Sequence, residues 1–161
     1  MKKVIAVLFV LMLALVASTG FTITVEKDRD GRFISYDDGT VLDTRTGRMW
    51  AERDNGSDID WEKAKSYCEN YREGGYTDWR LPTQDELEGL YDENKSRPAA
   101  CNREYNNHVA TELIDITCFP PWASETRGSD AAFFNFDSGD RYWNPQSNDR
   151  FYRALPVRSG K

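Results

Sequence analysis

The sequence predicts a single α+β domain, because strand-like blocks at both ends of the chain enclose two helix-like segments. The strand-like blocks are short, rich in strand formers and separated by turn residues. The helix-like segments begin with capping residues and repeat apolar side chains at helical spacing. With 161 residues, 39% of them hydrophobic, the chain has the length and the apolar content for one such domain.

The charge of the chain disfavours nucleic acid and anionic lipid as partners. The formal net charge is -6, and no basic run occurs beyond Lys2 and Lys3. Binding to a phosphate backbone needs clustered positive charge, and an acidic chain gains nothing from anionic headgroups. We therefore expect neither nucleic acid nor a membrane surface as a partner.

Residues 1–20 have the composition of a secretory signal peptide. Lys2 and Lys3 come first, an apolar run over 4–16 follows, and small residues close the segment at 17–20. The apolar run has about 13 residues, whereas a transmembrane helix needs about 20. We expect export and cleavage, which leave one domain over 21–161, secreted or periplasmic in a bacterial envelope and not inserted in the membrane. An uncleaved anchor is the alternative.

Two short strands are expected near the start of this domain, over residues 41–43 and 48–50. Both runs contain strand-forming residues, and the Thr-Arg-Thr-Gly stretch at 44–47 between them supplies a turn. These strands would form a hairpin that precedes the first helix.

The first helix is predicted to begin after Asp60 and to end at Gly74 and Gly75. Asp60 can cap the helix, and glycine commonly ends one. Its apolar face is made by Trp61, Ala64, Cys68 and Tyr71. This face predicts a helix that packs on the core along one side.

The second helix follows Pro82 and begins with a capping box. Thr83 and Glu86 have the spacing at which each side chain bonds the backbone of the other residue. The buried stripe of this helix is predicted at Leu87, Leu90 and Tyr91. After a polar stretch over 95–119, the segments 121–126, 131–143 and 151–159 predict three or four strands with a turn at 137–139.

Three cysteines lie in the predicted mature chain, so at most one internal disulfide can form. Cys101 and Cys118 flank a loop-like stretch, whereas Cys68 belongs to a helix face. We expect Cys101 and Cys118 to pair in an oxidising compartment and to stabilise the fold by roughly 3 kcal/mol. Cys68 is expected to be a buried, inert side chain.

Several motifs resemble the Lcl C-terminal domain family. They are GTVLDTRTGRMWA, DWEKAKSYC, GGYTDWRLPTQDELEGLYD, the segment 122–126 and a Tyr-Arg to Val-Arg terminal strand. The resemblance covers nearly all of 31–158. It implies a C-type-lectin-like fold, in which two helices frame a twisted antiparallel sheet, the termini lie close together and the second half carries ligand loops. It implies no particular substrate.

The stretch 135–152 mixes aromatic side chains with Asn, Asp, Ser and Arg, and we predict that it forms the ligand face. Its aromatic residues are Phe136, Tyr142, Trp143, Phe151 and Tyr152. Aromatic faces stack on sugar rings, and the same composition is typical of protein-binding paratopes. The predicted ligand-binding residues are Asp137, Asp140, Tyr142, Trp143, Asn144, Asn148, Asp149 and Tyr152. A hairpin whose aromatic residues alternate into the core is the alternative.

We expect a non-enzymatic recognition domain for a glycan or a protein surface, without a cofactor. The single His108 has no neighbouring nucleophile, and no Cys or His pair has zinc-ligand spacing. Calcium would need several converging oxygen ligands. The residues that could supply them are Asp137, Asp140, Asn144, Asn148 and Asp149. A solvated acidic loop explains these residues better than a Ca²⁺ site.

Two other functions stay open at this point. The Asn, Asp, Tyr and Ser content of 135–152 resembles segments that diversity-generating retroelements mutate in lectin-fold receptors, which would give a protein ligand that differs between strains. The other function is an exported enzyme of unknown reaction.

Overall fold

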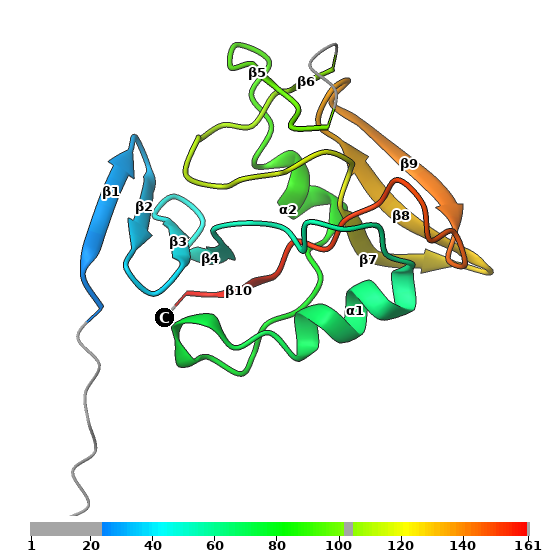
Figure 1. Ribbon diagram of the computed structural model, residues 1–161, viewed down its shortest axis with the longest axis horizontal. Coiled ribbons are helices and arrows are strands. Elements are labelled where there is room, and N and C mark those ends of the chain that lie inside the picture. Colours follow the sequence, from blue (N-terminus) through cyan, green and yellow to red (C-terminus); the bar gives the residue numbers. More distant parts are fainter. Residues whose placement is uncertain (1–23, 102–104, 161) are drawn as a thin grey trace, which may run out of the picture.

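Two antiparallel sheets, a short strand pair and two α-helices form the part of the chain that the structure describes (Figure 1). A computed structural model describes residues 24–101 and 105–160. The predicted signal peptide, residues 1–20, lies outside the described residues. Within those residues, no helix is long and apolar enough to cross a membrane. The predicted α+β class is confirmed.

The first sheet brings the two ends of the described chain together. In spatial order its strands are β1 (Glu26–Asp30), β2 (Phe33–Tyr36), β3 (Thr40–Asp43), β4 (Arg48–Ala51) and β10 (Val157–Ser159). All four pairings are antiparallel, and β3 and β4 are the two strands predicted around 44–47. Since β10 pairs with β4, the C-terminal segment completes a sheet begun by the N-terminal strands. Thr24 and Gly160 consequently border the same surface depression.

Helix α1 (Trp61–Glu69) begins where the sequence predicts. The Asp60 side chain accepts a hydrogen bond of 2.8 Å from the Lys63 backbone N–H, which satisfies one of the N–H groups left over at a helix start. Ala64 and Cys68 are fully buried along one side of the helix. The predicted cap and the buried position of Cys68 are both confirmed.

The prediction that α1 continues to the glycine pair was wrong. The helix ends at Asn70, whose backbone N–H and side-chain amide both donate to the Ser66 carbonyl. Gly74 and Gly75 lie beyond it in the 3-10 turn η1 (Glu73–Gly75), both at positive φ. These hydrogen bonds satisfy the Ser66 carbonyl at the end of the helix, so the helix ends before Gly74.

Helix α2 (Gln84–Glu88) starts with the predicted capping box. Thr83 accepts a hydrogen bond from the Glu86 backbone N–H, and the Glu86 carboxylate accepts one from the Thr83 backbone N–H. Burial alone would raise the pKa of Glu86, but hydrogen bonds from Arg80 and the Thr83 backbone lower it to about 2. Leu87 is fully buried below this polar start.

The second sheet carries the C-terminal strands. It is formed by β7 (Trp122–Arg127), β8 (Asp130–Asn135) and β9 (Asp140–Pro145), and a separate pair is formed by β5 (Arg97–Pro98) and β6 (Asn106–Asn107). Asn135 pairs with Asp140 across the end of the β8–β9 hairpin, so the predicted turn at 137–139 is confirmed. The segment 151–156, predicted as strand, is instead irregular: Phe151 is exposed at positive φ, and residues 152–156 are buried and lead into β10.

Two hydrophobic clusters connect these elements. The larger cluster joins the two sheets and α2 through side chains such as Val41, Trp50, Leu87 and Phe134. The smaller cluster packs α1 against the second sheet. Figure 1 shows α2 between the two sheets and α1 along the lower edge of the molecule in that view. This arrangement agrees with a C-type-lectin-like fold.

The disulfide between Cys101 and Cys118 is present as predicted. It connects residues 17 positions apart and lies beside the β5–β6 pair. Cys68 stays a thiol, and burial raises its pKa, which keeps it protonated and unreactive.

Candidate functional site

The eight predicted ligand-binding residues do not form one site. Asp137 and Asp140 lie at the start of β9, whereas Asn148 follows its far end, where its backbone N–H donates to the Pro145 carbonyl. The six residues of β9 separate these two groups by about 17 Å at about 3.3 Å per residue. The oxygen ligands considered for Ca²⁺ therefore do not converge. Among the described residues, no three His, Cys, Asp or Glu side chains are grouped in a way that could hold a metal ion.

Tyr152 belongs to the core and is closed off from solvent. Only 6% of its surface is exposed, and its ring stacks on Trp122 with centroids 4.0 Å apart. The Asn144 side-chain amide donates a hydrogen bond to the Tyr152 hydroxyl. Burial raises the pKa of this hydroxyl. Tyr152 and Asn144 thus hold the end of β9 to the core. For Tyr152, this matches the alternative in which aromatic residues of 135–152 point into the core.

The remaining β9 aromatics differ from each other in exposure. Trp143 is half-buried, and the Arg127 guanidinium covers its ring at 4.5 Å from the centroid. Tyr142 is 43% exposed, and its hydroxyl donates to the Asp140 carboxylate at 3.1 Å. Of the predicted β9 residues, Tyr142 and Asp140 are the two that present their side chains to solvent.

A different group of residues forms a cavity of about 460 Å³, which we call the aromatic cleft. Its lining residues are Cys101, Tyr105, Asn107, Ile116, Cys118, Phe119, Pro120, Asn135, Phe136, Asp137 and Phe151. The cleft is mostly apolar with a few polar groups, as small-ligand sites usually are. Of the predicted site residues, Asp137 alone lines it.

Two of the most exposed aromatic side chains in the described residues border this cleft. Tyr105 is 55% exposed and Phe151 is 59% exposed. The Phe151 ring meets Phe119 edge to face, with centroids 5.0 Å apart. Exposed aromatic rings beside a cavity lose water when a ligand covers them, so they favour binding there.

The backbone of Phe151 adds a second sign of function. Its φ is 68°, and it is the one residue other than glycine with positive φ among those described. Such a conformation costs about 1–3 kcal/mol in a bulky residue and is concentrated at functional sites. The strain therefore points to the same cleft as the exposed rings.

Asn135 and Asp137 supply polar groups to the cleft, whereas the Asn107 amide is buried and donates to the Ile116 carbonyl. The Asn135 side-chain oxygen accepts a hydrogen bond of 2.9 Å from the Asp137 backbone N–H, which fixes the turn. The Asp137 carboxylate accepts a long bond of 3.4 Å from the Asn106 backbone N–H. Asp137 is exposed and keeps acceptor capacity for a ligand hydroxyl.

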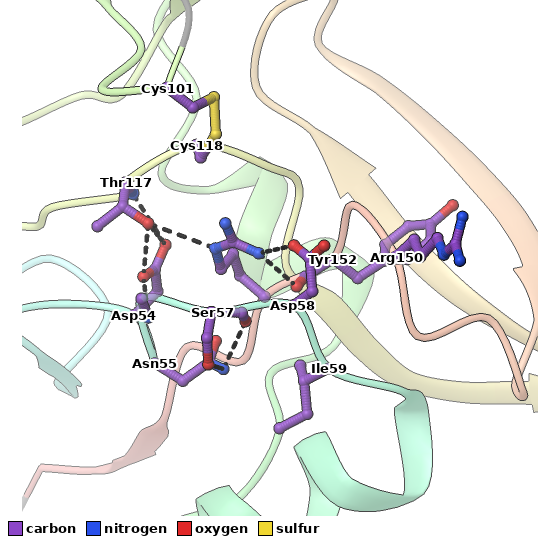
Figure 2. Close-up of polar contacts among 12 residues, drawn as sticks. Asp54, Asn55, Ser57, Asp58, Ile59, Cys101, Thr117, Cys118, Arg150 and Tyr152 are labelled. Carbon is purple, nitrogen blue, oxygen red and sulfur yellow. Dashed lines mark hydrogen bonds and ion pairs between the residues drawn. A yellow bond between two sulfur atoms is a disulfide. The ribbon is translucent and has the colours of Figure 1, made fainter.

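A network of polar contacts lies next to the disulfide that lines the cleft (Figure 2). Asp54 accepts hydrogen bonds from the backbone N–H and the hydroxyl of Thr117, next to the disulfide. Burial raises the pKa of Asp54, and these hydrogen bonds offset the rise only in part. Arg153 is buried and lies 4.9 Å from the Phe119 ring centroid. It forms an ion pair of 2.5 Å with Asp58.

Tyr105 and Phe119 were not among the residues predicted for the site. Both lie in the polar stretch 95–119, which shows no strand or helix periodicity. Phe151 was noted among the aromatic residues of 135–152 but was not selected. Its left-handed backbone carries no sequence signal, because neither glycine nor asparagine occupies the position.

The comparison with protein families gives one match. The model of the Lcl C-terminal domain matches residues 39–158, which run from β3 to β10 and include every residue of the aromatic cleft. The hairpin of β1 and β2 precedes the matched region, although the resemblance seen in the sequence begins at residue 31. The search of curated proteins found no match. Since the match covers more than half of the sequence, the chain belongs to the Lcl C-terminal domain family.

Proposed function

We propose that this protein is a secreted, non-enzymatic recognition domain that binds a neutral glycan in the aromatic cleft. Family membership favours ligand recognition as the general role. The observation that carries the finer proposal is the cleft itself, in which solvent-exposed Phe151 and Tyr105 border a cavity with Asp137 at its rim.

The chemistry of the cleft suits a sugar ring. The apolar face of a pyranose stacks on an aromatic ring, and the removal of water from both surfaces favours this contact. The carboxylate of Asp137 and the amide of Asn135 are planar groups that can pair with adjacent hydroxyls. One face of the ligand would thus lie on the Phe151 ring, while hydroxyl groups at its edge would form hydrogen bonds with Asp137 and Asn135.

The charge of the lining favours a neutral ligand over an acidic one. Asp137 is the acidic residue among the described residues that line the cleft, and neither Lys nor Arg is among them. An anionic sugar would meet the like charge of this carboxylate, and no cationic side chain among the described lining residues would compensate for it. Binding through one carboxylate also needs no Ca²⁺, which requires six to eight oxygen ligands.

Export is supported by the disulfide. Cys101 and Cys118 line the cleft and are bonded to each other, and such bonds persist in oxidising compartments. The composition of residues 1–20 supports the same conclusion.

A glycan array on the oxidised protein, run with Ca²⁺ and again with EDTA, tests this proposal. We expect signals on neutral oligosaccharides, weaker signals on their sialylated forms and no change with EDTA. Phe151→Ala should abolish the signals, and Tyr142→Ala is the matched control, because Tyr142 is an exposed aromatic residue outside the cleft.

Three outcomes would contradict the proposal. Signals that disappear in EDTA would indicate a metal-dependent site. Equal losses in the two alanine variants would place the ligand elsewhere. An array without signals would turn the search toward a protein ligand, for which the exposed aromatic and amide residues are also suited.

A further inference from the structure

The aromatic cleft is bordered by two exposed rings that do not contact each other. Phe151 is 59% exposed and Tyr105 is 55% exposed. In the described part of the chain, the Phe151 ring meets that of Phe119, and none of the contacts between aromatic rings involves Tyr105. We propose that the cleft has two stacking subsites, one on Phe151 and one on Tyr105, and that its ligand is a neutral oligosaccharide of at least two sugar rings. This inference rests on the proposed function and narrows its ligand class.

The Tyr105 subsite is fixed through its backbone. The Tyr105 carbonyl accepts a hydrogen bond of 2.8 Å from the Ala99 backbone N–H. The next residue, Asn106, belongs to β6, which pairs with β5. Between Ala99 and Tyr105, Cys101 is bonded to Cys118 (Figure 2). The backbone that presents this ring is therefore ordered before a ligand arrives, which lowers the entropy cost of binding.

The Phe151 subsite is held by a different set of contacts. The Phe151 ring meets Phe119 edge to face, with centroids 5.0 Å apart, and the Arg153 guanidinium lies 4.9 Å from the Phe119 ring centroid. The Arg153 backbone N–H donates to the Pro120 carbonyl at 3.1 Å. None of these contacts involves Tyr105. The two rings are therefore supported independently, as two separate subsites require.

The β8–β9 turn brings a polar group toward the Tyr105 subsite. The Asp137 carboxylate accepts a hydrogen bond of 3.4 Å from the Asn106 backbone N–H, and the Phe136 carbonyl accepts one of 2.8 Å from the His108 backbone N–H. These bonds fix the turn against the strand that begins just after Tyr105. Asp137 can therefore accept hydrogen bonds from hydroxyl groups of a ligand that extends from Phe151 toward Tyr105.

The size of the cleft agrees with a ligand of more than one sugar ring. Its volume is about 460 Å³, and clefts of about 300–1,000 Å³ commonly hold ligands of drug size. A disaccharide belongs to that size class, whereas a single sugar is smaller. A single sugar would cover one of the two exposed rings and leave the other in water. A longer ligand removes water from both rings, which favours its binding.

The dependence of affinity on ligand length tests the two subsites. The probes are the neutral oligosaccharide with the strongest array signal and its shortened forms of one, two and three rings, titrated into the oxidised protein. We expect affinity to rise about 10-fold or more between one ring and the length that first covers both aromatic side chains, because a second aromatic contact is added. Repetition of identical units alone would raise affinity only in proportion to their number.

Substitutions of Tyr105 assign this rise to the second subsite. In Tyr105→Ala we expect the longer probes to bind no better than one ring, while the affinity for one ring changes less than about 2-fold, since separate sites act independently. Tyr105→Phe keeps the ring and should keep the rise. Phe151→Ala should weaken binding at every length. Tyr142→Ala, the exposed aromatic control outside the cleft, should leave every affinity unchanged.

Two results would overturn the second subsite and leave the proposed function standing. One is equal affinity for one ring and for the longer probes in the natural protein. The other is a rise with length that persists in Tyr105→Ala, which would place the second contact elsewhere. Failure of the proposed function is distinct from both, because it would appear on the array as an absence of signals from neutral glycans, and the inference would then fall with it.

Discussion

Phe151 is the residue at which, in the proposed function, stability and ligand contact oppose each other. Its left-handed backbone and its exposed ring both cost free energy in the unliganded fold. Glycine would adopt the same φ without strain. The contact of the ring with a ligand, as in the proposed function, would explain phenylalanine in place of glycine at this position.

Replacement of Phe151 by glycine should have opposite effects on stability and on binding. Phe151→Gly should raise the free energy of unfolding by up to about 1 kcal/mol, because it removes the strain, and should abolish glycan binding. Thermal unfolding and the glycan array measure the two effects. A loss of stability larger than about 1 kcal/mol would show that the ring mainly packs.

At the scale of elements, α2 depends on its polar start. The helix has five residues, too few to be stable from propensity alone. The capping box satisfies its first N–H groups, and the Gln84 amide donates to the Phe133 and Tyr142 carbonyls of the second sheet at 2.9 and 3.1 Å. Caps and long-range bonds therefore keep α2 in place between the sheets.

Removal of the cap should destabilise the protein without affecting the cleft. We expect Thr83→Ala to lower the free energy of unfolding by about 1 kcal/mol, and Thr83→Ser, which keeps the hydroxyl, to lower it by much less. Urea denaturation measures both. If the two variants are equally stable, the hydroxyl of Thr83 does not hold the helix start.

The Glu86 carboxylate makes the stability of α2 sensitive to acid. The folded pKa is about 2, below the ordinary value of 4.5. Its stabilising contribution is therefore complete above pH 4.5 and is lost as the pH falls toward 2. We expect the free energy of unfolding to fall over this interval, and to fall less steeply in Glu86→Gln. Equal slopes in both proteins would assign the acid sensitivity to other carboxylates.

At the scale of the molecule, the disulfide and the buried thiol have separate roles. Cys101 and Cys118 tie the loop of Tyr105 to the segment that carries Phe119, so the bond closes one wall of the cleft. Cys68 lies fully buried between α1 and the second sheet. The disulfide is thus part of the candidate site, and the Cys68 thiol is part of the core.

The disulfide should contribute to both stability and binding. Replacement of Cys101 and Cys118 by Ser together should cost about 3 kcal/mol of stability, the value expected for a loop of this length, and should weaken glycan binding. Denaturant unfolding and the array measure the two losses. Full binding at a temperature where the variant is folded would show that the bond does not shape the cleft.

Cys68 should react with a thiol reagent only after unfolding. Burial excludes the reagent and raises the thiol pKa, so the reactive thiolate is absent in the native protein. A colourimetric thiol assay should detect no thiol in the native oxidised protein and one thiol per chain in denaturant. Fast reaction of the native protein would contradict the buried position.

The local features of this protein could be predicted from its sequence. The Asp60 cap, the Thr83–Glu86 box, the β3–β4 turn and the turn at 137–139 were predictable, because each depends on residues within a few positions of one another. The pairing of Cys101 with Cys118 was expected because Cys68 was placed on a helix face, and the structure confirms it, although sequence alone does not fix which cysteines pair. The end of α1 was not predictable from its glycines, because side-chain contacts at Asn70 intervene.

The set of side chains that line the aromatic cleft follows from contacts between distant parts of the chain and could not be predicted from local patterns. Tyr105, Phe119 and Phe151 come from separate parts of the chain and meet where the disulfide, the β8–β9 turn and the segment before β10 converge. The same packing buried Tyr152 and paired Asn144 with it, although both resemble ligand residues in sequence. Whether an aromatic side chain faces the core or a ligand depends on contacts between distant residues, and composition does not encode them.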